Sequence, residues 1–127
     1  MSELTAEQHH MLEQYDQLLD TISEGLEYLE NYITAEAPPQ TQQVFQDVLL
    51  GLEQVSRSHD QMAVLFEERE EIQPLIIDFH EVVQMLQGWF TLETNEEKRG
   101  LLVEKVVPAY EEWRTRVQSF VKPYISH

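Results

Sequence analysis

The chain has 127 residues, no cysteine and a formal net charge of −16. This length predicts a single domain, residues 1–127, that can bury a core without disulfides or metals. The lack of cysteine excludes disulfides and thiolate metal sites. The acidic charge argues against nucleic acid or an anionic membrane as a partner.

The sequence also predicts a protein that neither spans a membrane nor enters the secretory pathway. No segment has the run of about 18 apolar residues that a membrane-spanning helix needs. The N-terminus, Met1-Ser2-Glu3, lacks the basic segment and apolar run of a signal peptide. We therefore expect a cytoplasmic protein.

Apolar residues recur at alternating spacings of three and four, a pattern typical of helices that bury one face. The first helix is predicted over residues 4–34 and the second over residues 41–71, with Thr41 as its N-cap. Pro38 and Pro39 separate them, because proline cannot continue a helix there. The predicted buried faces are Leu12, Tyr15, Leu19, Ile22, Leu26, Leu29 and Ile33, then Phe45, Val48, Leu52, Val55, His59, Met62 and Phe66.

Two further helices follow. The third is predicted to start at Pro74 and to end at residues 90–93. Thr94 is the expected N-cap of the fourth, which runs to about Lys122, where Pro123 ends it. The predicted buried faces are Ile76, Phe79, Val83, Leu86 and Phe90, then Val103, Val106, Tyr110, Trp113, Val117, Phe120 and Tyr124.

Short connections place consecutive helices side by side and antiparallel. The predicted fold class is therefore all-α, an antiparallel up-down-up-down four-helix bundle. Pro108 lies inside the fourth helix and predicts a kink near that residue. All eight Lys and Arg residues follow residue 56, most of them in the fourth helix. We expect them to face the acids of the first helix, at about 0–1 kcal/mol for each exposed pair.

The predicted helices differ in length. The first two have about 31 residues and the third about 18, a mismatch of roughly 15–20 Å. The end of the first hairpin would then project from the bundle with apolar side chains exposed. We expect these side chains to form an interaction surface, whose members are Leu29, Tyr32, Ile33, Val44, Phe45 and Leu49.

A second uncovered patch is expected at the opposite end, where the fourth helix would pass the start of the first. Its members are Val117, Phe120, Val121, Tyr124 and Ile125. Three covers are possible for both patches: the chain itself, a second copy in a homodimer, or another protein.

Gly25 and Gly51 fall at one level of the first hairpin. Glycine costs up to about 1 kcal/mol against alanine in a helix interior. Either two backbones approach closely there, or a niche receives a bulky side chain.

His59 is the one polar residue within an apolar helix face, at the level of Tyr15 and Asp16 on the first helix. These three residues form a candidate buried polar site. A structural role predicts a histidine that is hydrogen-bonded to a neighbour. A functional role would make His59 the centre of a metal-binding or small-ligand-binding bundle.

The sequence contains no phosphate-binding glycine loop, nucleophile elbow or Cys–His pair. We expect no enzymatic activity and no cofactor. The predicted function is that of a protein-protein interaction module, which binds itself or a basic, amphipathic partner helix in the manner of a chaperone. The alternative is the ligand-binding or metal-binding bundle centred on His59, with possible enzymatic activity.

Overall fold

The chain is all-helical in a computed structural model that describes residues 4–126, and no strand occurs among these residues. The α-helices in chain order are α1 (Ala6–Tyr32), α2 (Gln40–Leu65), α3 (Ile72–Gln87), α4 (Asn95–Leu101) and α5 (Val107–Ile125). A 3₁₀ turn, η1 (Gly88–Thr91), extends α3, and a π-helical turn, η2 (Leu102–Val106), joins α4 to α5. Since α4, η2 and α5 run without a break, we call them together the fourth rod. The prediction of four helices and no strands is confirmed.

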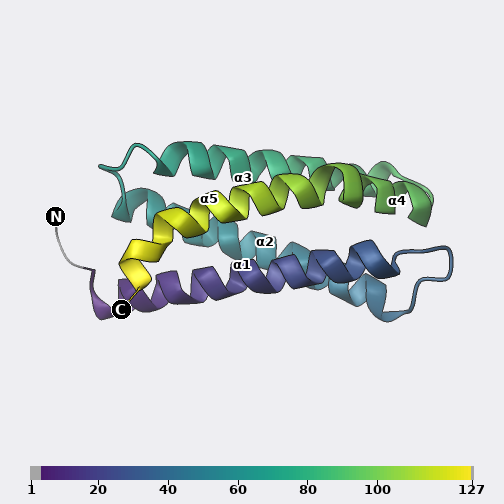
Figure 1. The fold of residues 1–127 in the computed structure, drawn as a ribbon, viewed down its shortest axis with the longest axis horizontal. Coiled ribbons are helices and arrows are strands. Elements are labelled where there is room, and N and C mark those ends of the chain that lie inside the picture. The colour runs from purple at the N-terminus through teal and green to yellow at the C-terminus, as the bar shows by residue number, and fades with distance from the viewer. Residues whose placement is uncertain (1–3, 127) are drawn as a thin grey trace.

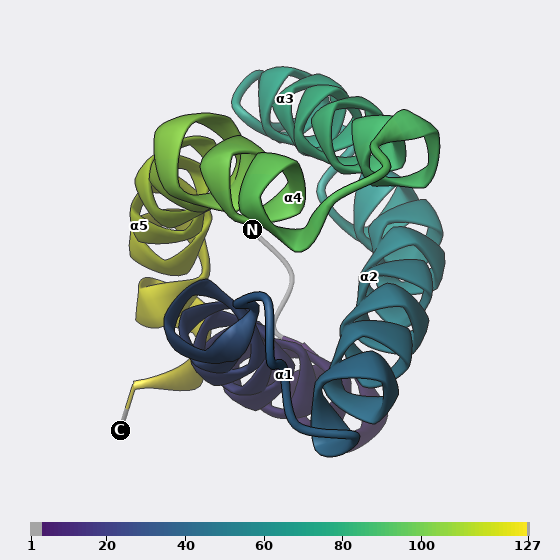
Figure 2. The same ribbon diagram turned by 90° about the vertical axis from the view of Figure 1, so that its right-hand side faces the viewer.

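Each of the four long helices contacts two neighbours around a common core. The helix α1 packs against α2 and α5, and α3 packs against α2 and α5. Figure 1 shows the helices lying along one long axis, and Figure 2 shows them in cyclic order around that axis. These contacts are consistent with the predicted antiparallel bundle.

The helix starts follow their local sequence. Thr5 caps α1 and Thr94 caps α4, each in a capping box with the residue three positions later, Gln8 or Glu97. The prediction of Thr41 as the N-cap of the second helix is wrong. Its helix begins at Gln40, and the N-cap position is Pro39, which offers no side-chain acceptor. Proline fits here because its missing N–H would be unpaired in the first turn anyway.

The helix ends differ more from the prediction. The helix α2 ends at Leu65, six residues before the expected end, and α3 begins at Ile72, two residues before Pro74. The fourth rod continues through Pro123 to Ile125. A proline this close to a C-terminus removes only one backbone hydrogen bond, and Ile125 packs against the core beyond it.

The irregular turn η2 ends at Val106, two residues before Pro108, which is the second residue of α5. In a regular α-helix a proline ring clashes with the carbonyl four residues earlier. That carbonyl belongs to Glu104, inside the π-helical turn. The structure therefore places an irregularity where the sequence predicts a kink, and the kink itself stays a prediction.

The predicted buried faces of the first two helices are confirmed at every position. The third face is partly wrong, because Ile76 and Val83 are half-buried and Phe90 is exposed. The face that α3 and η1 bury consists of Ile72, Leu75, Phe79, Val82, Leu86 and Trp89.

In the fourth rod Leu102 is buried in place of Val103, because the π-helical turn shifts the buried face by one residue. Phe120 and Tyr124 are half-buried, and Val121 takes the fully buried position beside them.

The glycines allow α1 and α2 to approach closely. A Cβ added to Gly25 would lie 2.7 Å from Val48 Cγ2, and one added to Gly51 would lie 2.9 Å from Ile22 Cγ1. Both distances are too short for real carbon contacts. The chain's own side chains occupy the space, so the glycines serve close packing of the two helices.

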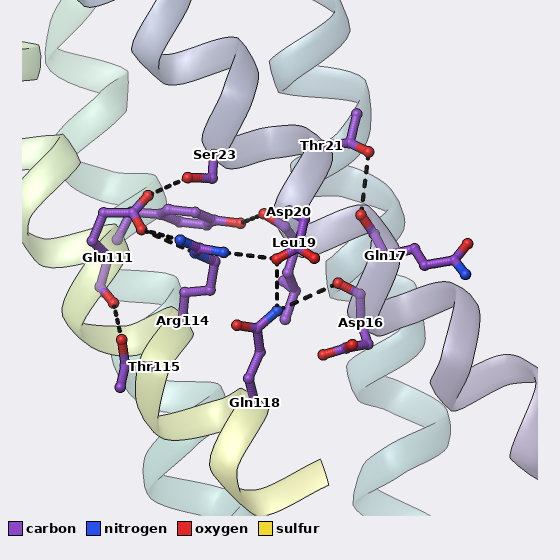
Figure 3. Close-up of polar contacts among 11 residues, drawn as sticks. Asp16, Gln17, Leu19, Asp20, Thr21, Ser23, Glu111, Arg114, Thr115 and Gln118 are labelled. Carbon is purple, nitrogen blue, oxygen red and sulfur yellow. Dashed lines mark hydrogen bonds and ion pairs between the residues drawn. The ribbon is translucent and has the colours of Figure 1, made fainter. Parts of the chain in front are cut away.

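Polar side chains join α1 to α5 along the outside of their contact, as Figure 3 shows. Arg114 Nη1 lies 2.7 Å from Asp20 Oδ1, and Gln118 Nε2 donates to the same oxygen at 2.9 Å. On the adjacent turn Ser23 donates to the Glu111 carboxylate. The basic fourth rod thus faces acids of α1 at Arg114, as the sequence predicts.

Candidate functional site

The predicted interaction surface at the end of the α1–α2 hairpin is largely covered by the chain itself. Leu29 is fully buried, and Ile33 and Phe45 are only 3% and 6% exposed. Val44 and Leu49 are half-buried. Tyr32 alone among the six predicted residues is exposed, at 50%. The prediction of a projecting hairpin end is therefore wrong, and of the three covers left open by the sequence the chain itself supplies this one.

Three contacts explain this correction. Trp89 stacks on Phe45 with ring centroids 4.1 Å apart. The side chain of Asn95 donates to the backbone oxygen of Thr34 at 2.7 Å. Arg99 Nε donates to the backbone oxygen of Glu30 at 2.8 Å. Because η1 and α4 reach the end of α1, they cover the apolar residues that the predicted lengths left exposed.

The patch predicted at the opposite end is covered in a similar way. Val117 and Val121 are fully buried, and Phe120 packs edge-on against Phe66 in the connection between α2 and α3. Arg69 of the same connection lies over the Phe120 ring, 4.9 Å from its centroid. The chain therefore covers much of this patch too, while Phe120, Tyr124 and Ile125 stay half-buried.

Although its apolar residues are covered, the hairpin end carries a hollow of about 610 Å³. We call it the tip hollow. Figure 2 looks onto this end, where the α1–α2 connection and α4 lie nearest the viewer. Its lining residues are Ile33, Ala37, Pro38, Pro39, Thr41, Gln42, Phe45, Gln46, Leu49, Trp89, Phe90, Leu92, Asn95 and Lys98. Ile33, Phe45 and Leu49 of the predicted surface thus come together as part of its wall.

A second, smaller hollow of about 320 Å³ lies between α2 and α3. We call it the α2–α3 groove. Its lining residues are Leu49, Leu52, Glu53, Ser56, Phe79, His80, Val83, Leu86, Gln87 and Phe90. Leu49 and Phe90 line both hollows, so the two adjoin. The Phe90 side chain is 66% exposed where they meet.

Sequence reasoning assigned Phe90 to the core and did not connect Lys98 with this end. The available signal was the aromatic pair Trp89 and Phe90 directly before a turn. In a helix face only one of two adjacent aromatics can point inward. The other is left at the surface.

Of the candidate buried polar site, the structure brings two residues together. Tyr15 Oη and His59 Nε2 lie 2.7 Å apart in a hydrogen bond, and both side chains are buried. The His59 ring also meets Phe79 and Trp113 edge-on. Its Nδ1 has no hydrogen-bond partner among residues 4–126.

Burial controls the ionisation of this pair. It lowers the pKa of His59 from 6.5 to about 4, with a smaller contribution from His80. Burial, and to a lesser extent Tyr110 and Asp16, raises the pKa of Tyr15 well above its usual value. Both side chains are therefore neutral at pH 7.

Asp16 does not join them. It is half-buried on the α1 face toward α5, where Figure 3 shows it beside Gln118. Burial and the neighbouring Asp20 raise the pKa of Asp16, while Gln118 and Arg114 oppose that rise. Within residues 4–126 no three His, Cys, Asp or Glu side chains are grouped to hold a metal ion.

The chain is thus an all-helical protein whose surface carries two hollows, of about 610 Å³ and about 320 Å³. Residues 10–116 match a family described as a domain of unknown function, DUF8042, and the chain belongs to this family. No curated protein and no solved structure matches the chain significantly. None of the described helices is long and apolar enough to cross a membrane.

Proposed function

We propose that the chain is a non-enzymatic protein-binding module, an antiparallel four-helix bundle kinked near Pro108. Its occupant is a basic, amphipathic helix of another protein, which lies along the α2–α3 groove. The cytoplasmic setting expected from the sequence belongs to the same proposal. The observation that carries it is Phe90, a large apolar side chain exposed at the end of an apolar groove.

The shape of the α2–α3 groove supports a helix as occupant. Leu49 and Leu52 on one wall face Val83 and Leu86 on the other. A volume of about 320 Å³ holds a few apolar side chains but no folded domain. A helix that presents apolar residues at spacings of three and four supplies side chains of this kind.

Charge supports a basic partner. The wall contributed by α2 contains Glu53, and residues 1–56 contain no Lys or Arg. The net charge of −16 attracts a cationic helix and accelerates its association. The same charge on a second copy opposes self-association.

A photo-crosslinking amino acid in place of Phe90 tests the proposal in the source cell, with Tyr32 as the matched exposed aromatic position. We expect a protein to be crosslinked from Phe90 and not from Tyr32, and its crosslinked segment to be a basic amphipathic helix. Crosslinks to a second copy, or from Tyr32 alone, would contradict the proposal.

A synthetic peptide with the sequence of the crosslinked segment is then used to measure the affinity of the chain for its partner helix. We expect Val83→Glu, at the groove wall, to weaken binding at least tenfold. Val64→Glu is the matched control, because Val64 is 71% exposed on α2 and does not line the groove. Equal binding by the two variants would refute the α2–α3 groove as the docking site.

A further inference from the structure

The tip hollow differs in charge from the chain as a whole. The chain has 24 Asp and Glu residues against eight Lys and Arg residues. Yet among the described residues that line the tip hollow none is acidic, and one, Lys98, is a cation. Its Nζ lies 5.3 Å from the centroid of the Trp89 ring. Within residues 4–126 no carboxylate forms an ion pair with it at 4 Å or less.

The polar part of the wall includes several hydrogen-bond donors. It contains the start of α2, a helix of 26 residues whose N-terminus has no side-chain cap and no acid in its first turn, although the Thr41 N–H there already donates to the Pro38 oxygen at 3.0 Å. Backbone N–H groups and the helix dipole favour an anion at such an end. The side-chain amides of Gln42 and Gln46 line the same hollow.

The buried hydroxyl of Thr41 is a second, independent observation that points to a ligand in the tip hollow. It lines the tip hollow in the first turn of α2 and is 5% exposed. Its hydroxyl is one of two buried side-chain polar atoms without a hydrogen-bond partner in residues 4–126. A buried group of this kind costs about 1–3 kcal/mol when it stays unpaired. An acceptor atom in the hollow would remove this cost.

The rest of the wall is aromatic and aliphatic. Phe45 and Trp89 are stacked, and Phe90 meets Phe45 edge-on with centroids 5.9 Å apart. A volume of about 610 Å³ is within the usual range of small-molecule sites, roughly 300–1,000 Å³. The hollow therefore offers an apolar surface beside a group of donors and a cation.

We infer that the tip hollow binds a small apolar monocarboxylate. The carboxylate accepts from Thr41, the start of α2 and Lys98, and the apolar body lies on the aromatic side chains. A single negative charge is favoured over a dianion such as a phosphate monoester, because the net charge of −16 repels each added charge. This inference goes beyond the proposed function, since its ligand is a small molecule and the α2–α3 groove is not needed for it.

The probe is 3-phenylpropionate, titrated into the ¹⁵N-labelled chain and followed by amide chemical shifts. We expect the largest shifts at residues 41–43 and Lys98, with a Kd on the order of 1 mM for a ligand of this size. The neutral 3-phenylpropionamide has the same body and should bind about tenfold more weakly, since it lacks the charge-assisted hydrogen bonds. Phenyl phosphate should also bind more weakly.

Two variants and one control locate the site. Lys98→Met and Thr41→Val should each weaken 3-phenylpropionate at least threefold and weaken the amide less. Lys122→Met removes a cation at the far end of the fourth rod and should leave both affinities unchanged. Equal affinity for acid and amide, or equal losses in Lys98→Met and Lys122→Met, would overturn the inference. Val83→Glu should retain the carboxylate site, so its outcome is separate from that of partner binding.

Discussion

The helix α2 packs against α1 on one side and α3 on the other, and the two contacts differ. Toward α1, glycines at positions 25 and 51 bring side chains of the opposite helix against the backbone. Toward α3, the chain leaves a hollow of about 320 Å³ and two half-buried residues, Leu49 and Val83. The distance between two helices depends on the size of the residues at their contact. One periodic helix can thus form a closed face and an open one.

The largest effect expected from this comparison comes from truncating leucine on either face. Leu26→Ala removes a side chain that is 1% exposed and should lower the free energy of unfolding by about 3 kcal/mol, because a cavity remains. Leu49→Ala, at the open face, should lower it by about 1 kcal/mol, since its site is half-solvated already. Urea unfolding measures both. Equal losses would show that the two faces are packed alike.

A smaller effect is expected from acidification, through the histidine that contacts both α1 and α3. The folded chain keeps His59 neutral down to about pH 4, whereas the unfolded chain protonates it near pH 6.5. Stability should therefore be lost as the pH falls from about 6.5 to about 4. By linkage the loss from His59 between pH 7 and pH 5 is about 2 kcal/mol.

The double variant Tyr15→Phe/His59→Leu isolates this contribution, because it replaces both hydrogen-bond partners by apolar groups. Its stability, measured in urea at pH 7 and pH 5, should fall by about 2 kcal/mol less than that of the parent chain. An identical fall in the two proteins would exclude His59 as the source.

The smallest effect is expected at the glycines. Gly51→Ala places a Cβ against Ile22 and should destabilise the chain by about 1 kcal/mol, since overpacking outweighs the gain in helix propensity. Gly100→Ala meets no described atom within 4 Å and should stabilise the chain by up to about 1 kcal/mol. Thermal melting of both variants tests the difference in sign. A stabilising Gly51→Ala would show that the α1–α2 contact is looser than described.

The sequence predicted the closed part of the bundle better than the open part. Adjacent apolar pairs such as Leu18 with Leu19 also occur in α1 and α2, but in each of these helices one apolar stripe runs through seven positions, and all seven are buried. In α3 adjacent apolar pairs, Ile76 with Ile77 and Val82 with Val83, allow more than one face to satisfy the same period. The choice between these faces of α3 depends on the positions of α2 and α5, which the spacing of apolar residues does not specify.

Helix ends limited the prediction of the site. The hairpin end was identified as unusual from its apolar residues, and three of these line the tip hollow. The choice among the three covers stayed open, because an error of six residues at the end of α2 displaces the third helix by about 9 Å along the bundle. The orphan hydroxyl of Thr41 and the acid-free wall depend on atomic positions, so no sequence pattern predicts them.

The π-helical turn η2 separates α4 from α5, so residues in the two parts of the fourth rod can be substituted independently. Its backbone hydrogen bonds span five residues in place of the four of an α-helix, so it resets the rotational phase between α4 and α5. Asn95 and Lys98 are aimed at the tip hollow by the phase of α4, while Tyr110 and Trp113 are aimed at the core by the phase of α5. Substitutions that change the direction of side chains at the tip hollow can therefore accumulate without rotating the aromatic side chains on which the fold depends.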